Sequence, residues 1–459
     1  MSGARWGLSP AAWRLAAAVG IAVGIAYTLS PLTVWFAAAM GLLLRSVWRR
    51  LEGNERRWVV ALLVIAIALR VAALAALFAS TNHAQVPFGT FFGDEEYYLR
   101  RSIWMRNLAL GLPLHTADMI YMFDETGLTS HLSVLAVLQM LVGISPYGLH
   151  LLGMAFYLVA CVLLHRTVRA GFGPMPAFAG LLVLLCLPSL FAWSVSALKE
   201  PLFVLLTAAT VVLAVVAVRG PGVWRRIAAT AGIVLAAAAL ESIRAGALVL
   251  TAASLAAGLA LTLLALHPRL LIATVVALPI VTGAVLSRPA VQSRVFAGLV
   301  AAAGQHWGHV ETPGYVYKLL DQRLYPDKSN ISDMHFGETM RFVVRAVVRY
   351  VTAPEPWSAP SRTALSFVPE QVVWYLLAAF VPLGLLFAFH RDAVVAGLMT
   401  GYTVVAAGTV ALVSGNVGTL VRHRGLALPY LIWLSAVGIC ECLAWIGRHR
   451  TNPNRVSTH

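Results

Sequence analysis

Three consecutive carboxylates follow an apolar stretch of the chain. Asp94, Glu95 and Glu96 stand in the sequence FFGDEEYYLRR, residues 91–101. A carboxylate at a membrane boundary can take the proton from an attacking hydroxyl group, which is the work of a general base. Acidic residues in a loop are more often simply solvated, so this motif needs partners elsewhere in the chain before it indicates a site.

Other ionisable residues lie within or at the ends of apolar runs, where they are costly and therefore suggest function. They are Arg70 inside one run, Lys199 and Glu200 in SALKEP, Glu241 and Arg244 in ESIR, and Arg422 and Arg424 in GNVGTLVRHRG. Lysine and arginine can hold a lipid-borne phosphate, and arginine can do so with two parallel hydrogen bonds. If the phosphate is also a leaving group, these cations stabilise the charge that develops on it.

Each of these residues also has a structural explanation. Arg70 could pair with a neighbouring helix, and Lys199 beside Glu200 could mark an ordinary helix start with an acid in its first turn. Arg422 and Arg424 could be anchors at the end of a span, although they would then oppose the usual distribution of positive charge. The sequence leaves both explanations open.

Residue types that bind metals occur in HWGHVE, with His306, His309 and Glu311, and again at Asp333 and His335. Their spacing is loose and we expect a loop there, so no metal site is predicted. The sequence contains no Asp-x-Asp motif, no glycine-rich nucleotide loop and no Walker motif. It indicates no cofactor, and it leaves a divalent metal open without pointing to one.

The composition is that of a polytopic membrane protein. Of 459 residues, 59% are apolar and only 12% are charged, with many long apolar runs. The net charge of +15 does not predict a nucleic-acid partner, because the basic residues form short clusters between the runs. All four cysteines fall inside apolar runs and are interpreted as free thiols. The excess of arginine over lysine and the many alanines suggest a bacterial genome rich in GC.

About twelve apolar runs are long enough to cross a bilayer, which predicts an all-α transmembrane bundle. They are 15–29, 32–46, 58–80, 149–165, 175–192, 200–218, 227–242, 245–266, 270–286, 371–389, 393–414 and 426–446. The first two flank Pro31 and form a hairpin, which either crosses twice or re-enters; we expect it to be retained in the mature chain. The apolar stretch 131–145 is short, and we expect it to lie in the membrane interface.

The distribution of positive charge decides the expected orientation. If 131–145 does not cross, the short loops on one side hold most of the basic residues, which identifies that side as cytoplasmic. These residues are Arg45, Arg49, Arg50, Arg56, Arg57, Arg166, Arg169, Arg219, Arg225, Arg226, Arg269, Arg391, Arg448, Arg450 and Arg455. We then expect both termini to lie in the cytoplasm and the protein to reside in a plasma or inner membrane. Lys199, Arg244, Arg422 and Arg424 face outward together with the carboxylates.

Five segments follow from this topology. We expect an N-terminal membrane hairpin at 1–50, a catalytic transmembrane module at 58–286 with an outer loop at 81–148, a second long outer loop at 287–370, C-terminal membrane helices at 371–447 and a cytoplasmic tail at 448–459. Within the outer loops, 95–110 could form an amphipathic helix along the membrane, and 341–352 shows apolar periodicity. No internal repeat is evident.

The order of these motifs resembles a known family. An apolar span with an arginine, ALRVAALAALF around Arg70, precedes the acidic loop motif GDEEYYLRRSIW that includes Tyr97. The stretch at 140–174, MLVGISPYGLHLLGMAFYLVACVLLHRTVRAGFGP, then precedes PSLFAWSVSALKEP at 188–201, and Arg422, Arg424 and Pro429 precede the final span. This order resembles the GT-C class of integral membrane glycosyltransferases, in particular its protein mannosyltransferase and aminoarabinose transferase branch.

The resemblance covers 58–220 well and 371–446 loosely. It implies transfer, with inversion, of a hexose or pentose from a polyprenyl-phosphate donor to a hydroxyl group on a lipid, glycan or protein, as in cell-envelope polysaccharide biosynthesis. The first acid of the motif, Asp94, would be the general base, with Glu95 in support or in contact with the acceptor. The hairpin at 12–46 and the loop at 287–370 depart from the family pattern, which leaves the acceptor undefined.

Two other functions stay open. A polysaccharide polymerase or ligase that uses polyprenyl-pyrophosphate glycans would also need outward-facing arginines and a large outer loop. A transporter or lipid flippase would use the charges to line a path, but the sequence lacks matched halves with interrupted spans. Under the favoured interpretation, Asp94 and Glu95 are the catalytic candidates. The substrate-binding candidates are Arg70, Tyr97, Lys199, Glu200, Glu241, Arg244, Arg422 and Arg424.

Overall fold

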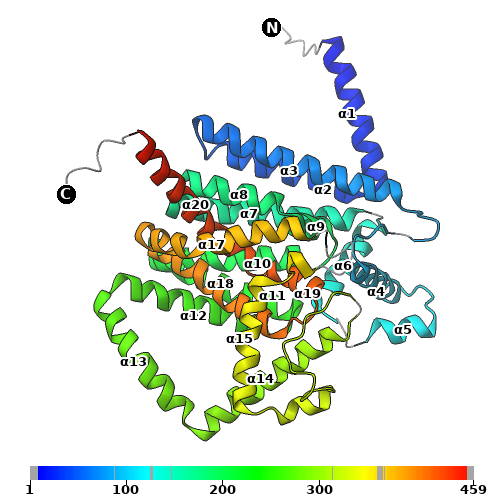
Figure 1. Ribbon diagram of the computed structural model, residues 1–459. Coiled ribbons are helices and arrows are strands. Elements are labelled where there is room, and N and C mark those ends of the chain that lie inside the picture. Colours follow the sequence, from blue (N-terminus) through cyan, green and yellow to red (C-terminus); the bar gives the residue numbers. More distant parts are fainter. Residues whose placement is uncertain are drawn as a thin grey trace. The chain divides into compact units, whose positions relative to one another are not determined.

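The protein is a bundle of α-helices with many membrane-spanning segments (Figure 1). The computed structural model describes residues 9–86, 88–124, 128–145, 147–312, 314–358, 365 and 367–451, and in these it contains no β-strand. Eleven of the described helices are long and apolar enough to cross a membrane. A bent pair, Pro174–Cys186 (α8) and Pro188–Val195 (α9), raises the number to twelve if it forms one span. The predicted all-α polytopic fold is confirmed.

The chain divides into two compact units. The first comprises Met1–Ala160, Phe191–Leu205 and Ser242–Arg244, and the second comprises the remainder. The first unit holds α1 (Pro10–Leu29), α2 (Pro31–Trp48), α3 (Gly53–Ser80), α4 (Gly93–Ala109), α5 (Thr116–Met122) and α6 (Ser130–Val142). Four helices contribute residues to both units: α7 (Gly148–Phe172), α9, α10 (Glu200–Arg219) and α11 (Val223–Ile243).

The second unit holds α8 and the later helices. These are α12 (Ala247–Leu266), α13 (Pro268–Leu286), α14 (Pro289–Val310), α15 (Phe336–Thr352), α17 (Val368–Arg391), α18 (Ala393–Val413), α19 (Val417–Arg424) and α20 (Leu428–Thr451), with short 3-10 helices at Lys328–Asp333 and Pro356–Ser358. The first eight residues of the predicted hairpin segment, and residues 452–459 of the predicted tail, lie outside the described residues.

The predicted spans coincide with helices, with one informative break. The predicted span 175–192 bends by 63° between α8 and α9. Pro188 lacks a backbone N–H, and it favours the extended conformation that Leu187 adopts, so the helix ends there and restarts. Helix α6 has 13 residues, which at about 1.5 Å per residue is shorter than a bilayer core of about 30 Å. Its length agrees with the expectation that this stretch does not cross.

Small residues let the central helices of the second unit pack closely. A methyl group added at Gly258 of α12 would lie 2.8 Å from the Cα atom of Leu398 in α18. A methyl group at Gly438 of α20 would lie 2.8 Å from the backbone nitrogen of Gly384 in α17. In lipid, such close approach of backbones is a principal source of helix association. The pairs α12–α18 and α17–α20 therefore form the centre of this unit.

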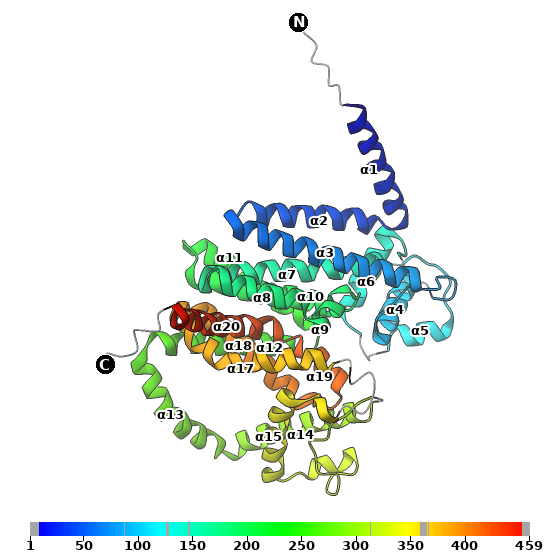
Figure 2. The ribbon, with the colours of Figure 1, turned by 45° about the horizontal axis from the view of Figure 1, so that its top comes forward.

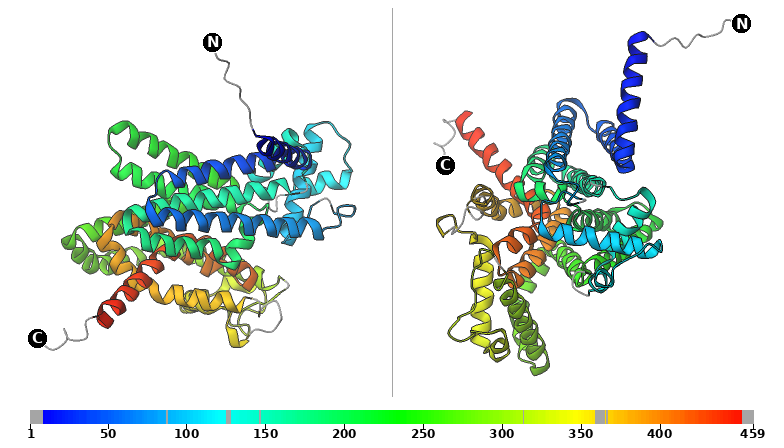
Figure 3. Two further views of the ribbon diagram at one scale, coloured as in Figure 1. Left: turned by 90° about the horizontal axis from the view of Figure 1, so that it is seen from above. Right: turned by 90° about the vertical axis from the view of Figure 1, so that its right-hand side faces the viewer.

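Two spans have no buried face. Helix α1 contacts its neighbour α2 but buries none of its own apolar window, and it projects away from α2 and α3 in Figure 2 and in the right-hand view of Figure 3. Helix α13 likewise has no buried residue, although its apolar side chains lie on every side. Apolar surface of this kind is suited to contact with lipid acyl chains.

The long segment before α17 contains a helix that the sequence did not predict. Helix α14 begins with Pro289 at its first turn and buries only Ala303 and His306. Because small residues make up much of this helix, its apolar periodicity is weak. The chain after it pairs with the beginning of α19: the amide of Val417, the first residue of α19, donates to the carbonyl of Tyr315 at 2.9 Å, beside an isolated bridge between Val316 and Asn416. The segment therefore supports the start of α19.

Candidate functional site

Glu95 joins two parts of the first unit that lie a hundred residues apart in sequence. Its side chain is fully buried. The Oε1 atom accepts a hydrogen bond of 2.6 Å from the backbone amide of Ala197, and Oε2 accepts one of 3.1 Å from the amide of Phe91. The Nε2 atom of His150 lies 2.8 Å from Oε1, at an angle that departs from a good hydrogen bond. Glu95 therefore fastens α4 to the turn between α9 and α10.

The acids on either side of Glu95 are more accessible. Asp94 is exposed in the first turn of α4, where the unpaired amides of the helix start favour a negative charge. Glu96 forms an ion pair of 2.6 Å with Arg100, one helical turn further on, at the surface. Of the three acids, Asp94 is the most accessible, while Glu95 fixes the helix that carries it.

Two predicted cations lie together in the first unit. The Nζ atom of Lys199 donates to the carbonyl of Ile243 at 3.4 Å, next to Arg244 in the chain. The same Nζ lies 5.9 Å from the ring centre of Tyr98, on α4. Lys199 follows Ala197 by two residues, so the turn that Glu95 holds also carries this ammonium group. The first unit therefore brings Lys199 beside the helix of Asp94, and the backbone next to Arg244 beside Lys199. Glu200, next in the chain, begins α10 in the same unit.

His131 is a buried member of this cluster that the sequence interpretation missed. Its Nε2 atom donates to the carbonyl of Ala197 at 3.1 Å, and its ring stands edge-on to Tyr98 with centroids 6.5 Å apart. Burial lowers the pKa of His131, so the ring is neutral at physiological pH. The sequence feature that could have pointed to His131 is its position as a histidine in the apolar stretch 131–145.

Arg70 packs inside the first unit. Its side chain is 1% exposed and is not extended to the membrane surface. Its Nε atom donates to Ser194 Oγ at 2.7 Å and a terminal nitrogen donates to the carbonyl of Ala66 at 3.2 Å. The guanidinium also lies over the rings of Tyr157 and Phe191, at 5.4 and 4.8 Å from their centres. These contacts favour the structural explanation, because they join α3 to α7 and α9.

Tyr97 also makes contacts within α4 and its neighbours. Its hydroxyl accepts a hydrogen bond from the fully buried Arg101 and donates to Asp124 at 3.4 Å. Arg101 in turn donates to the carbonyl groups of Met122 and Asp124. The pair holds the end of α5 against α4, and a substrate-binding role for Tyr97 stays a prediction.

The remaining predicted residues belong to the second unit. Glu241 accepts hydrogen bonds from the amides of Gly246 and Leu248, at 3.0 and 2.8 Å, and so caps the start of α12. Arg422 is partly exposed on α19, whereas Arg424 two residues later is almost fully buried. Glu241, Arg422 and Arg424 thus lie in the second unit, whereas Asp94, Lys199 and Arg244 lie in the first.

Arg424 binds backbone carbonyl groups at the end of α15. Its guanidinium donates to the carbonyls of Tyr350 and Ala353 and, at 2.9 Å, to Gln371 Oε1. It also lies over the ring of Trp374, at 4.7 Å from the centre. Burial lowers its pKa to about 10, so it stays charged at neutral pH. Arg424 therefore acts here as a cap for α15, and phosphate binding by it stays a prediction.

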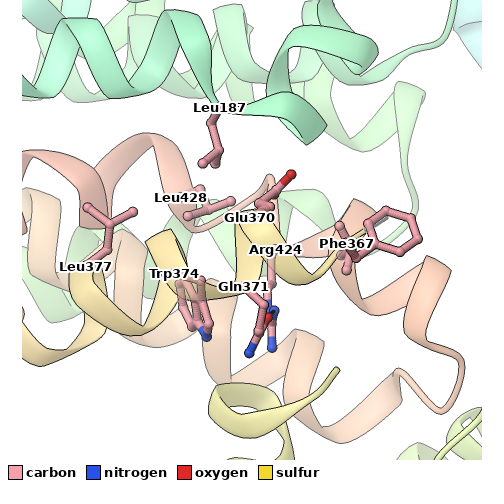
Figure 4. A pocket seen from close by; sticks show the side chains of 9 residues that line it. Leu187, Phe367, Glu370, Gln371, Trp374, Leu377, Arg424 and Leu428 are labelled. Atoms are coloured by element: carbon pink, nitrogen blue, oxygen red, sulfur yellow. Dashed lines mark hydrogen bonds between the residues drawn. The ribbon is translucent and has the colours of Figure 1, made fainter. Parts of the chain in front are cut away.

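A pocket of about 310 Å³ lies beside Arg424 (Figure 4). Its lining is mostly apolar, from α17, α19 and Leu187, with Glu370 as the acidic member. In Figure 4 the carboxylate of Glu370 and the guanidinium of Arg424 point in opposite directions. Glu370 accepts a hydrogen bond of 2.8 Å from the amide of Ser189, at the start of α9. Glu370 and Arg424 thus both bind backbone groups, and the side chains that line the pocket between them are mostly apolar.

The histidines of HWGHVE cap another helix. The Nδ1 atom of His306 donates to the carbonyl of Ser414 at 2.9 Å, and Nδ1 of His309 donates to that of Val413 at 2.6 Å. Both carbonyls lie at the end of α18, where they have no partner within the helix. In the part of the chain that is described, no group of three or more histidine, cysteine or acidic residues could hold a metal ion.

We expect His306 to make the protein sensitive to acid. Burial lowers its pKa from 6.5 to about 4. Between these two pKa values the unfolded chain binds a proton that the folded chain does not. The contribution of neutral His306 to the free energy of unfolding is therefore fully present above pH 6.5, and it decreases by roughly 3 kcal/mol toward pH 4. Unfolding measured in detergent from pH 7 to 4 should therefore show a smaller acid loss in His306→Gln, which keeps a donor to Ser414. Equal losses in both proteins would contradict this assignment.

Comparisons with protein-family models, curated proteins and solved structures found no match for this chain. The class that the fold defines is that of a multi-pass helical membrane protein. The predicted residues that the first unit holds near the buried Glu95 are Asp94, next to it on α4, Lys199 on the turn that it binds, and Arg244, which follows the carbonyl that Lys199 contacts. We call this set the α4 cluster below.

Proposed function

We propose that the protein is a membrane glycosyltransferase. It would move one monosaccharide from a polyprenyl-phosphate donor to a hydroxyl acceptor at the outer face of a plasma or inner membrane, with inversion at the sugar. The observation that carries this proposal is the hydrogen bond from Ala197 to Glu95, because it joins the helix of the exposed acid to the turn that carries Lys199. The order of motifs shared with the GT-C class supports the same conclusion.

The residues of the α4 cluster suit the steps of such a transfer. Asp94 takes the proton from the acceptor hydroxyl while that oxygen attacks the anomeric carbon. The bond between the anomeric carbon and the phosphate oxygen breaks, and polyprenyl phosphate leaves with the electron pair. Lys199 and Arg244 balance the negative charge that develops on the leaving phosphate. Arg422, partly exposed on α19, stays a further candidate for donor binding.

The outward orientation of this site is part of the proposal. It rests on the basic residues of the short loops, which by the positive-inside rule would lie in the cytoplasm together with both termini. The helix boundaries support it, because twelve crossings with α8 and α9 counted as one would leave the starts of α4, α10 and α12 on the same side.

The direct test is transfer by the purified full-length chain in liposomes. Hexose, pentose and aminopentose donors on radiolabelled polyprenyl phosphate are supplied with a membrane glycolipid extract. We expect one donor to release polyprenyl phosphate, with a single sugar added per acceptor. Absence of release with every donor would overturn the proposal. Ladders of repeat units would instead indicate a polymerase, and donor flux without acceptor would indicate a transporter.

A further inference from the structure

Helix α15 carries two opposite faces. The side that packs on its neighbours holds Thr339, Phe342, Ala346 and Tyr350, spaced three and four residues apart. A second stripe of large apolar side chains is exposed: Phe336, Met340, Val344, Val347, Val348 and Val351. Val344 is 60% exposed and Val348 53%. The folded chain leaves this second stripe without a protein partner among the described residues.

The end of α15 is attached where a membrane span begins. The carbonyl of Val351 accepts hydrogen bonds from Gln371 and Trp374, at 3.2 and 2.8 Å. The carbonyl of Thr352 accepts one of 2.6 Å from the hydroxyl of Tyr375. These three donors lie in the first turns of α17, which is long and apolar enough to cross the membrane. The end of α15 is therefore at the level where that span enters the bilayer.

The direction of α15 suits the plane of a membrane. Figure 1 shows α15 running across α17 and α18 rather than along them. Val372 and Leu376, which follow Gln371 and Tyr375 in the chain, are also exposed on α17. A helix that lies across the spans at their end, with one apolar face uncovered, has the features of an interfacial helix.

Two arginines of α15 border a shallow pocket of about 300 Å³ next to this stripe. Arg341 is exposed and makes no hydrogen bond or ion pair within the described residues, while Arg345 is exposed and donates to the carbonyl of Leu319 at 3.2 Å. Two acids also line the pocket: Glu338 accepts hydrogen bonds from the hydroxyl of Tyr325 and an amide, and Asp321 accepts one from an amide. The pocket is therefore of mixed charge, and the two exposed guanidinium groups of α15 form its cationic side.

We propose that α15 is an interfacial helix that binds an anionic phospholipid. Its exposed stripe lies among the acyl chains, and Arg341 with Arg345 contacts the lipid phosphate. A lipid fits better than a soluble protein, because cations and apolar side chains alternate along one helix that is attached to a membrane span. This proposal does not rest on the α4 cluster or on the proposed glycosyl transfer.

Quenching by brominated lipids tests the position of α15. The four native cysteines are replaced by serine, and single cysteines carrying a fluorophore are placed by Val348→Cys on the stripe, Ser329→Cys as an exposed loop control, and Val275→Cys on the exposed span α13. We expect Val348→Cys to be quenched nearly as strongly as Val275→Cys, and Ser329→Cys to be much less quenched. Quenching of Val348→Cys no stronger than that of Ser329→Cys would overturn the proposal.

The same label tests the preference for an anionic lipid. With the label at position 348, brominated phosphatidylglycerol should compete at least about threefold better than brominated phosphatidylcholine, since each arginine near a membrane surface favours anionic lipid measurably. Arg341→Gln with Arg345→Gln should bring this ratio close to one. The matched control, Arg288→Gln with Arg294→Gln, removes two exposed arginines at the start of α14 and should leave it unchanged. A ratio unaffected by the α15 pair would contradict phosphate binding there.

Discussion

Asp94→Asn is expected to lower the rate of sugar transfer by about a hundredfold to ten-thousandfold, the usual contribution of a general base. The amide keeps the size and polarity of the side chain but cannot accept the proton of the acceptor hydroxyl. Since Asp94 is exposed in the first turn of α4, the substitution should leave folding unchanged. Initial rates in proteoliposomes, with the donor found active for the wild-type chain, measure the effect.

The neighbouring acid provides the control for this experiment. Glu96→Gln makes the same chemical change two residues away, at a surface ion pair with Arg100, and should retain nearly full activity. Binding of the labelled donor to Asp94→Asn should be close to that of the wild-type chain, because the acid acts on the acceptor and not on the donor phosphate. Full turnover by Asp94→Asn would exclude this residue as the base, whatever the result for Glu96→Gln.

Glu95→Gln is expected to destabilise the first unit by about 2–4 kcal/mol, because a buried acceptor of two backbone amides becomes a group with one acceptor and one donor. The amide nitrogen of the new side chain must then face the backbone amide of Ala197 or that of Phe91, and both of these are donors. The free energy of unfolding in mixed micelles measures the loss.

Glu96→Gln is also the control for Glu95→Gln, because it separates the effect of losing a buried hydrogen-bond acceptor from the effect of losing a negative charge. Glu96→Gln removes the same charge from the same helix turn at the surface, and its expected effect is within about 0.5 kcal/mol. Glu95→Gln should also lower the maximal rate of transfer through misplacement of Lys199, while the residual activity keeps its dependence on Asp94. A stability loss no larger than that of Glu96→Gln would show that the bonds of Glu95 are not needed to hold α4.

The spans could be predicted from the sequence because hydropathy alone determines them. Each of the twelve predicted runs overlaps a helix, and the short stretch at 131–145 corresponds to the short helix α6. The run 175–192 was predicted as one span from its hydropathy. Pro188 ends the helix within it, because proline has no backbone N–H to donate. Helix α14 was missed because alanine and glycine carry little apolar periodicity, even where they pack.

The arrangement of the charged residues could be predicted only in part. The sequence singled out Asp94 and Lys199 as members of one site, which stays a prediction, and it could not assign Glu95 or Arg424 their buried partners. Those partners are backbone amides and carbonyls, which every residue type possesses, so no motif marks them. Whether an arginine at a span end binds phosphate or holds backbone carbonyls therefore depends on the folded chain, as the bonds of Arg424 illustrate.

Arg424 connects the end of α15 to α19, the short helix that also carries Arg422. It holds the last carbonyls of α15 and stands two residues after Arg422 on the same short helix. A lipid that shifts α15 would act on α19 through this guanidinium, and on α17 through Gln371, Trp374 and Tyr375. The headgroup composition of the host membrane would then bear on the helix that carries Arg422, and regulation by the bilayer would require no separate sensor domain.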